Sequence, residues 1–538
     1  MKHFVYQLVE YLIMRQIIYL LLFIFLIFSC KNEKKEIVQL ENLKISIKEK
    51  LKRSLSDEYF TELGIEDSAK EVLRAYYKKN GYSPVWINDS TLTIKGAEVK
   101  KLLFNKHQFG IPDSRYLHFK WKNASYLKDE LLITATLAYI GKDLKEGFID
   151  KENFKMKPLE PVSLDELQKI TQFENDSISI AHQLIQLGPL DTNYQKIAMG
   201  LFDYCSNYPI DTSRFEIKSY RNDSLNAEIN TRKALLLKGY LSIENADSLT
   251  FDTALKLFQL HNGLKVDGKI GTYTAIALNE STKHKLLRTA LTLEKWRWKN
   301  KYPSKFVRIN LPEYLLRFYS EDTLRSTNRI IIGKTETSSP ELTSKIRQLV
   351  VFPYWTVPQS IANKEILEKA KVDPDYFDRN HFKLFKNDLE INPASVNWAK
   401  YSTFPYKLRQ EFGPTNSLGI LKFEFHNRFG VYIHDTPNRE LFKKDVRSFS
   451  HGCMRCENPI ELAKLFLEKD SIRHKRNKYN SISLDSLFLL ENNYYISLVD
   501  PIPLFVEYKT VVIINSILTF FPDIYGRDEK YIGLMVEN

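Results

Sequence analysis

The chain has 538 residues, which exceeds the size of one hydrophobic core and predicts about two to four domains. With 43% hydrophobic and 27% charged residues, its composition is that of a globular protein and excludes a disordered or fibrous chain. The formal net charge of +12 would suit an anionic partner, but the basic residues are scattered and no nucleic-acid-binding motif accompanies them. Nucleic acid is therefore excluded as a partner.

The N-terminus has the pattern of an export signal. The apolar run Ile17–Ser29 follows Arg15 and has the length of a signal-peptide core, too short to cross about 30 Å of hydrocarbon. Residues 27–30 resemble a bacterial lipobox, which implies that Cys30 becomes the lipidated first residue after cleavage of residues 1–30. We expect Met14 to be the true start. The protein would then be anchored to the inner or outer membrane, on the periplasmic side of the cell envelope.

Helical periodicity dominates the next part of the chain. A hydrophilic tether is expected over residues 31–56 and a helical domain over residues 57–228. Apolar residues recur three and four positions apart in Ala69–Tyr77 and Leu131–Leu144, which is the period of an amphipathic helix. By itself this pattern indicates ordinary core-forming helices.

A small unit of different character is expected over residues 229–281. The helix Phe251–His261 ends at an Asn-Gly stop, an Asp-Gly turn follows, and a second helix is expected over Tyr273–Leu278. These signals alone predict a generic three-helix domain. However, the series FQ..NGL.VDG.IG..T...LN resembles the peptidoglycan-binding domain of many wall enzymes. The resemblance implies tethering to glycan or stem peptides.

From residue 305 the pattern changes from helix to strand. Short alternating or buried-type runs without regular intervening helices predict a sandwich-like or barrel-like β-rich domain over residues 305–500. A polar but aromatic-containing segment, about 362–410, interrupts it and is expected to be an ordered lid. Residues 501–538 are expected to form a C-terminal extension packed on this domain. The predicted fold class is multidomain α+β, with a helical domain, a small three-helix domain and a β-rich domain.

Two short stretches carry candidate chemistry. His434 ends the strand-like run VYIHDTP, and Cys453 lies in RSFSHGCMR. A nucleophilic thiol needs exposure, a base that deprotonates it, and hydrogen-bond donors for the oxyanion that forms on attack. Gly452 permits a sharp turn that presents the thiol, and a histidine on a preceding strand can reach the sulfur. This is the Cys/His arrangement of acyl-transfer enzymes, although an isolated Cys and His would more often indicate an inert buried thiol.

The whole pattern is more specific than the pair. His434, fifteen intervening residues and then the run Ser450–Arg455 resemble the signature of the YkuD-type L,D-transpeptidase domain. Further segments over roughly residues 60–530, including Tyr82–Trp86 and Gly413–Gly419, resemble the large multidomain branch of that family, which has a scaffold domain.

The resemblance implies a peptidoglycan L,D-transpeptidase that needs neither a metal nor another cofactor. Cys453 would attack the carbonyl of the L-centre of diaminopimelate or lysine in a stem tetrapeptide and expel D-Ala. His434 would take the thiol proton and later activate an amine of a neighbouring stem. The implied partners are peptidoglycan and carbapenem-type inhibitors, and the implied role lies in cell wall organisation and cell shape.

Supporting roles follow from the same resemblance. Backbone amides of Gly452 and Cys453 would bind the oxyanion, and the main-chain carbonyl of Asp435 would orient the imidazole. Arg455 would brace the loop or bind a substrate carboxylate. The remaining candidates are Ser450 and His451 in the cysteine loop and, along the substrate groove, Tyr354, Trp355 and Tyr432.

Cys456 leaves alternatives open. Cys453 and Cys456 form a C-x-x-C motif, which elsewhere marks a thiol redox protein or half of a metal site. The sequence has no second such motif and no closed zinc set, which disfavours both, but a regulatory disulfide between the two cysteines stays open. A further alternative is a non-catalytic wall-anchoring lipoprotein with a vestigial catalytic domain.

Overall fold

The computed structural model describes residues 47–536 except 89, 122–124, 173–176, 299–300, 374 and 474–478. The predicted signal peptide, Met14 and Cys30 lie outside the described residues. The described residues form two compact units, which fall within Met1–Asp203, Trp296–Trp298 and Gly533–Asn538 for the first and within Tyr204–Lys295 and Lys299–Ile532 for the second. Within the described residues, no helix combines the length and apolarity that a membrane crossing needs.

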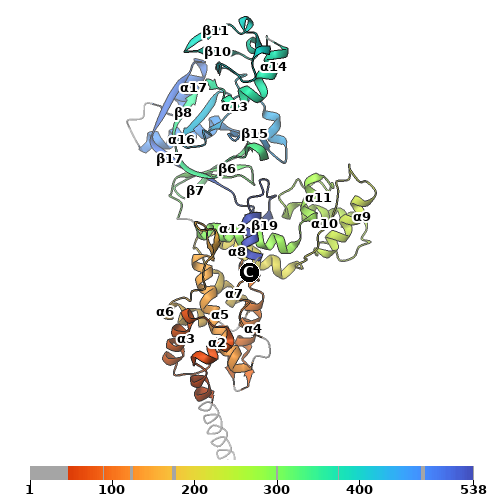
Figure 1. Cartoon of the computed structure of the whole chain (residues 1–538), viewed down its shortest axis with the longest axis vertical. Coiled ribbons are helices and arrows are strands. Elements are labelled where there is room, and N and C mark those ends of the chain that lie inside the picture. Colours follow the sequence, from red (N-terminus) through yellow and green to blue (C-terminus); the bar gives the residue numbers. More distant parts are fainter. Residues whose placement is uncertain are drawn as a thin grey trace, which may run out of the picture. The chain divides into compact units, whose positions relative to one another are not determined.

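The first unit is helical, as predicted, and is drawn in red to yellow in Figure 1. Its longest helix, α5, is buried along most of its length and packs against the helices before and after it. Two short hairpins complete the unit. Its elements are α2 (Asp57–Leu63), α3 (Asp67–Lys79), β1 (Ile87–Asn88), β2 (Thr91–Leu92), α4 (Ile94–Phe104), α5 (Tyr126–Glu146), β3 (Ile149–Asp150), β4 (Lys155–Met156), α6 (Leu164–Thr171), α7 (Ser177–Ile185) and α8 (Thr192–Asn207), whose last residues belong to the second unit.

The buried carboxylate of Glu130 on α5 holds the segment Tyr82–Trp86. One oxygen accepts hydrogen bonds from the Val85 backbone N–H at 2.8 Å and the Tyr77 hydroxyl at 3.0 Å, and the other accepts from the Trp86 backbone N–H at 2.8 Å. Burial raises the pKa of Glu130 to about 7, although these hydrogen bonds act in the opposite direction. The carboxylate therefore fixes this segment against α5.

The second unit contains a small helical part of α9 (Asn226–Leu237), α10 (Ser248–His261) and α11 (Thr272–Asn279) around its own core. Helix α12 (Thr282–Arg297) follows, and its last two residues belong to the first unit. The Asp-Gly turn between α10 and α11 is held by Gln259. Its side-chain oxygen accepts from the backbone N–H groups of Asp267 and Gly268 at 3.0 and 2.9 Å, and its amide donates to the Lys269 carbonyl at 3.0 Å. Gln259 and the turn in the predicted wall-binding motif thus have a structural role.

The strands of the second unit form one sheet in the order β15-β7-β16-β14-β13-β8-β17-β5-β6. Because β6 also pairs with β7, the sheet closes on itself, with β15 attached outside the ring. The β-rich domain is therefore confirmed, and of the two predicted forms, sandwich-like or barrel-like, it is a barrel around one hydrophobic core. Its strands are β5 (Phe306–Asn310), β6 (Leu315–Ser320), β7 (Thr323–Gly333), β8 (Leu342–Val351), β13 (Leu421–Phe425), β14 (Ile433–His434), β15 (Ser448–Ser450), β16 (Met454–Cys456) and β17 (Tyr494–Glu507).

The interrupting segment is an ordered subdomain with a separate core, built around Phe377, Trp398 and Phe404. Its sheet has the order β11-β10-β12-β9, so it begins at Trp355 and not near residue 362 as expected. We call residues 355–410 the lid. Its elements are β9 (Trp355–Thr356), α13 (Gln359–Ile361), the π-helix η3 (Ala362–Ile366), α14 (Leu367–Val372), α15 (Tyr376–Arg379), β10 (Phe382–Lys386), β11 (Leu389–Ile391) and β12 (Lys407–Gln410).

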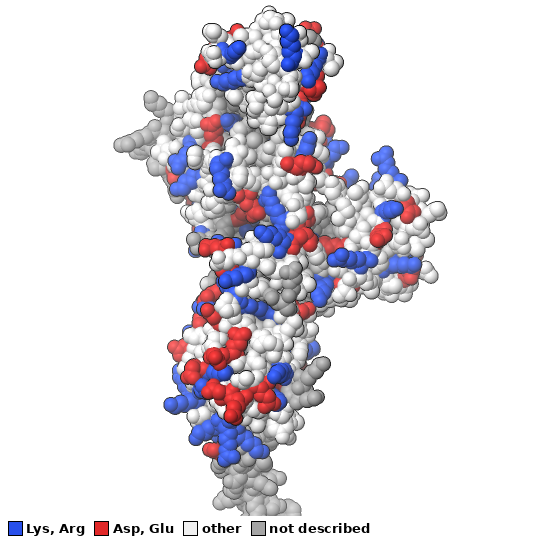
Figure 2. All heavy atoms as spheres, in the orientation of Figure 1, with Lys and Arg blue, Asp and Glu red and all other residues white. Residues whose placement is uncertain are grey.

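The C-terminal boundary expected at residue 501 is wrong. Strand β17 runs without a break across this position and pairs with both β5 and β8, so residues 501–507 are part of the barrel. The other elements of this region are α16 (Pro459–Arg473), α17 (Ser481–Leu489), β18 (Val511–Ile514), β19 (Ile517–Phe520) and α18 (Glu529–Val536). On the face shown in Figure 2, basic and acidic side chains are interspersed, which agrees with their scattered positions in the sequence.

Candidate active site

The barrel places strand β14, which ends at His434, beside the parallel strand β16, which Cys453 directly precedes. On β14 and β16, Ile433 pairs with Met454 and His434 pairs with Arg455, while the Met454 N–H donates to the Tyr432 carbonyl at 3.0 Å. Ile433 and Met454 are buried in the barrel core. Since side chains alternate along a strand, those of Tyr432, His434 and Arg455 lie on the outward face, and Cys453 comes at the level of Tyr432.

His434 is a buried, neutral imidazole with a fixed orientation. Its Nδ1 lies 2.5 Å from the main-chain carbonyl oxygen of Asp435, and because a carbonyl only accepts, Nδ1 carries the proton. Burial lowers the pKa of His434 to about 3, and the positive charges of Arg455 and Lys422 act in the same direction. At neutral pH the imidazole is therefore uncharged, with Nε2 as a proton acceptor.

The carboxylate of Asp435 serves the fold and not the imidazole. One oxygen accepts from the Ile420 N–H at 3.0 Å, and the other forms an ion pair with Arg439 at 2.7 Å. Gly419 allows this approach, since a Cβ at that position would lie 2.3 Å from the carboxylate oxygen. Main chain and side chain of Asp435 thus have separate roles.

The Cys453 thiol is half-buried and protonated at rest. Burial raises its pKa, while hydrogen bonds from Tyr432 and the charges of Lys422 and Arg455 lower it. The Tyr432 ring lies 5.6 Å from the imidazole between centroids, and its hydroxyl hydrogen bonds to the thiol. The resting site is a neutral Cys/His pair with Tyr432 against both members.

The loop before Cys453 is shaped by hydroxyl groups. Gly452 has a φ of +112°, which side-chain-bearing residues rarely adopt. The Ser450 hydroxyl accepts from the Gly452 N–H at 3.2 Å and donates to the Cys453 carbonyl at 2.5 Å, and the Ser339 hydroxyl donates to the Gly452 carbonyl at 2.7 Å. The Gly452 amide is thus occupied, whereas within the described chain no acceptor takes the Cys453 N–H. The expected pair of oxyanion donors is reduced to Cys453.

The side chain of Arg455 has no hydrogen bond or ion pair with any residue that the structure describes. Its Nε is buried without a partner, and burial lowers the pKa of the guanidinium. The expected bracing of the loop is not seen. A buried donor without a protein partner is a candidate for binding an anionic ligand.

The lid contacts the site at two points. Glu365 on η3 accepts a hydrogen bond from His451 Nε2 at 2.6 Å, and the Trp355 indole donates to the Tyr432 hydroxyl. The Tyr354 ring centroid lies 4.6 Å from the Arg409 guanidinium, and the ring also packs against Phe412. The sequence interpretation missed Glu365, Ser339 and Lys422, because only the folded chain brings them to the site.

The C-x-x-C hypothesis is contradicted by the strand geometry. Cys456 is fully buried in the barrel core, and burial raises its pKa to about 12. Three residues of extended chain separate the two Cα atoms by about 10 Å, beyond the roughly 7 Å that a disulfide permits. Both cysteines are free thiols. Neither a regulatory disulfide nor a dithiol redox centre is compatible with this arrangement.

Comparison with known families assigns two regions. The profile of the YkuD L,D-transpeptidase catalytic domain matches residues 304–473, and the profile of the scaffold domain matches residues 71–201. A curated candidate L,D-transpeptidase of Haemophilus influenzae is 32% identical over 226 residues, which are 41% of this chain and 44% of that protein. The chain therefore aligns with less than half the length of this relative.

Two solved structures also align with the chain. An L,D-transpeptidase from Stackebrandtia nassauensis has 11% identity and a TM-score of 0.17, covering 56% of this chain and 96% of that one. An L,D-transpeptidase from Xylanimonas cellulosilytica has 12% identity and a TM-score of 0.16, and the match covers 56% of this chain and 100% of that protein's chain.

Proposed function

We propose that this chain, which contains an L,D-transpeptidase catalytic domain and a scaffold domain, is a peptidoglycan L,D-transpeptidase that uses Cys453 as nucleophile and His434 as base. The observation that carries the proposal is the neutral imidazole, held through Nδ1 by the Asp435 carbonyl, on the strand beside the half-buried thiol. A base that is neutral and oriented can accept the thiol proton as attack occurs.

Acylation would proceed in two steps. His434 Nε2 takes the thiol proton while the sulfur bonds to the carbonyl carbon at the L-centre of a stem tetrapeptide. The Cys453 N–H, without a protein acceptor in the described chain, stabilises the oxyanion. The bond to D-Ala then breaks, and the imidazolium gives its proton to the departing amine, which leaves a thioester on Cys453.

Deacylation reverses these roles. The amine of a neighbouring stem attacks the thioester, and His434 removes a proton from the attacking nitrogen. The new amide bond joins the two stems, and the sulfur leaves with a proton returned from His434.

Arg455 fits the carboxylate of the departing D-Ala. It is in register with His434 on the neighbouring strand, and its buried Nε has no partner among the described residues. Pairing with a carboxylate would satisfy this donor and orient the scissile bond. We therefore assign Arg455 to substrate binding and not to the loop.

The direct test uses the full chain in detergent with disaccharide-tetrapeptide. Mass spectrometry should detect D-Ala release and a cross-linked dimer with the wild-type protein but not with Cys453→Ala. Cys456→Ala removes the neighbouring thiol outside the site and is the matched control, which should still form both products. Wild-type protein that forms neither product would contradict the proposal and favour a non-catalytic wall-anchoring protein.

We further propose that residues 229–281 bind peptidoglycan and that Cys30 carries a lipid anchor in the cell envelope. The first proposal is supported by the motif and by the compact core around α9 to α11. Co-sedimentation with purified sacculi should weaken severalfold when these residues are deleted. The second would appear as palmitate labelling that Cys30→Ser abolishes.

A further inference from the structure

The segment between β7 and β8, residues 334–341, holds the loop that precedes Cys453. The Ser450 carbonyl at the start of this loop accepts two hydrogen bonds, from the Lys334 backbone N–H at 2.9 Å and from the Thr337 hydroxyl at 3.1 Å. Thr337 and Ser450 are 113 residues apart in the sequence. The position of the cysteine loop therefore depends on a distant part of the chain as well as on its own hydroxyl groups.

Ser339 in the same segment holds the end of the loop. Its side chain is fully buried, and its hydroxyl donates to the Gly452 carbonyl at 2.7 Å and accepts from the Gly333 N–H at 3.0 Å. The three backbones approach closely, because a Cβ at Gly333 would lie 2.8 Å from the Ser339 nitrogen and 3.1 Å from the Gly452 Cα. The Ser339 hydroxyl therefore holds the Gly452 carbonyl at a fixed place.

This bond also sets the direction of the proposed oxyanion donor. The Gly452 carbonyl and the Cys453 N–H belong to one planar trans peptide group, so they point in opposite directions. Fixing the carbonyl on one side therefore fixes the N–H on the other. The Cys453 N–H donates to no acceptor among the described residues, and an oxyanion donor is effective only when it is oriented before the reaction.

Ser339 is held in turn by residues near the C-terminus. The Tyr525 hydroxyl donates to the Gly333 carbonyl at 2.7 Å and accepts from the Ser339 N–H at 3.3 Å, so it bridges the two segments. The Arg527 guanidinium donates to the Ser339 carbonyl at 2.7 Å. Both backbone groups of Ser339 are thus bonded to the C-terminal segment, residues 523–528.

The C-terminal segment has its own internal support. The Tyr525 ring stacks on Tyr508 with 5.8 Å between centroids and 21° between planes, and its N–H donates to the Tyr508 hydroxyl at 2.9 Å. The Tyr508 hydroxyl donates to Asp523, whose carboxylate also accepts from the backbone N–H groups of Arg527 and Asp528 at 3.0 and 2.9 Å. The Tyr525 hydroxyl is therefore presented by a bonded turn.

We infer that Ser339 and Tyr525 are positioning residues that orient the Cys453 N–H toward the oxyanion, which makes the C-terminal segment a working part of the active site. The inference rests on the proposed function, in which this N–H stabilises the oxyanion. Neither hydroxyl touches the reacting atoms. Without the Ser339 hydroxyl the Gly452 carbonyl loses its donor, and without the Tyr525 hydroxyl Ser339 loses part of its support. The thiol and His434 keep their own contacts in both cases.

Two reactions of the same thiol separate this role from a general structural one. Attack on the ring carbonyl of a carbapenem passes through an oxyanion before the ring C–N bond breaks. Alkylation by iodoacetamide joins the sulfur to a methylene carbon as iodide leaves, and no oxyanion forms. Both reactions need the thiol proton to be removed. Loss of the oriented N–H should therefore slow acylation and leave alkylation unchanged.

The test uses the full chain in detergent, with each adduct mapped to Cys453 by mass spectrometry. Ser339→Ala should slow carbapenem acylation about 100-fold and Tyr525→Phe about tenfold, whereas alkylation should stay within about twofold of wild type. The kcat for D-Ala release should fall by the same factors, with little change in KM.

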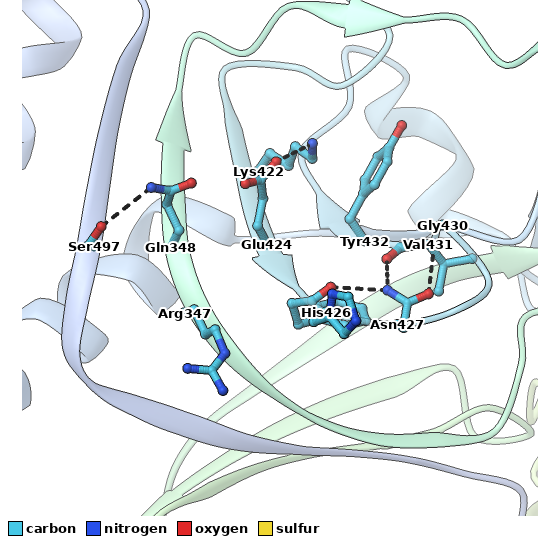
Figure 3. Close-up of a pocket in the computed structure, with 11 residues that line it drawn as sticks. Arg347, Gln348, Lys422, Glu424, His426, Asn427, Gly430, Val431, Tyr432 and Ser497 are labelled. Atoms are coloured by element: carbon cyan, nitrogen blue, oxygen red, sulfur yellow. Dashed lines mark hydrogen bonds and ion pairs between the residues drawn. The ribbon is translucent and has the colours of Figure 1, made fainter.

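The matched control is Ser497→Ala. It removes a serine hydroxyl from the same barrel, where Ser497 on β17 accepts from the Gln348 amide on β8 at 3.4 Å and makes no contact with the cysteine loop (Figure 3). All three rates should equal those of wild type. Melting temperatures would show whether Ser339→Ala is folded, and if it is not, Tyr525→Phe decides alone because it keeps the ring and loses only the hydroxyl.

The outcomes separate this inference from the proposed function. Equal losses of acylation and alkylation would show that the substitutions disturb the thiol or its base, and the inference would be wrong. Unchanged acylation in both variants would overturn it as well. Wild-type protein that is acylated but releases no D-Ala would contradict the proposed substrate, while the acylation rates of the variants would still support the positioning role. Wild-type protein that does neither would overturn both.

Discussion

Glu130 in the first unit and His434 in the second are both buried titratable groups held by hydrogen bonds, yet their surroundings differ. Burial drives each toward its neutral form, raising the pKa of Glu130 to about 7 and lowering that of His434 to about 3. Both oxygens of Glu130 accept hydrogen bonds from the protein. Beside His434, the Cys453 N–H and the Arg455 Nε have no partner among the described residues.

This difference indicates how a buried polar group contributes to a protein. A centre whose hydrogen-bonding capacity is filled internally stabilises the fold, since its partners would lose their bonds on any change. A centre surrounded by unsatisfied donors has capacity left for a ligand or a transition state. We therefore expect substitutions at Glu130 to change stability and substitutions around His434 to change activity.

The largest effect should come from His434→Gln. The variant loses the acceptor for the thiol proton, and the rate of D-Ala release should fall by about 10³-fold. The melting temperature, measured by circular dichroism, should change by only a few degrees. If activity fell by less than about tenfold, another group would be the base. The expected contrast, in which Glu130 affects stability and His434 affects activity, would then be wrong.

The second effect concerns stability. Because the pKa of Glu130 is about 7 in the folded protein and its ordinary value is 4.5, the native state binds more protons between these values. The stabilisation that Glu130 gives to the folded state is therefore fully present below its ordinary pKa. It is lost as the pH rises through about 7, which lowers the free energy of unfolding by about 3 kcal/mol. Denaturant unfolding of wild type and Glu130→Gln across this window should show this slope only in the wild type. Parallel curves would contradict it.

The third effect tests the open donor beside the imidazole. Arg455→Gln removes a positive charge that lowers the pKa of His434, so this pKa should rise. The acid limb of the acylation rate, where the imidazole becomes protonated and inactive, should then move to higher pH. Carbapenem acylation followed by mass spectrometry across about pH 4 to 8 would measure it. If the acid limb of the acylation rate stays at the same pH while the preference for a substrate with the D-Ala carboxylate weakens, then Arg455 acts only in substrate binding.

The sequence was sufficient for the parts of the site that are close along the chain. His434 and Cys453 could be found because a strand end and a Gly turn have local signatures. Alternation along a strand could also have shown that Cys453 and Cys456 have opposite orientations. Ser339, by contrast, meets the cysteine loop from 113 residues away, and no local pattern predicts that contact.

Barrel closure and domain limits were hidden for similar reasons. The pairing of β6 with β7 reads as an ordinary hairpin in the sequence, and only the remaining pairings show that it closes a ring. Strand β17 contains register shifts where it pairs with β8, which break the alternation that would have marked it as one element. Barrel closure and the end of the domain therefore depend on the register between strands far apart in the sequence, which local periodicity does not predict.

The smallest effect should come from the lid, where the His451 and Glu365 side chains meet at 2.6 Å but remain 34% and 42% exposed. An ion pair or hydrogen bond in such a setting contributes less than about 1 kcal/mol. Glu365→Gln should therefore raise the KM for tetrapeptide about two- to threefold by loosening lid closure, with kcat unchanged.

The control is Glu368→Gln, which lies in the same segment and removes an exposed pair with Lys371 away from the cysteine loop. It should leave both constants unaltered. If Glu365→Gln instead lowered kcat by about 100-fold, then His451 would have to orient the Gly452–Cys453 turn itself. The pair of His451 and Glu365 would then resemble Glu130, because its hydrogen bond would hold a segment of backbone in place. The active site would in that case contain a polar pair that acts by fixing structure, and the proposed distinction between stabilising and catalytic groups would be wrong there.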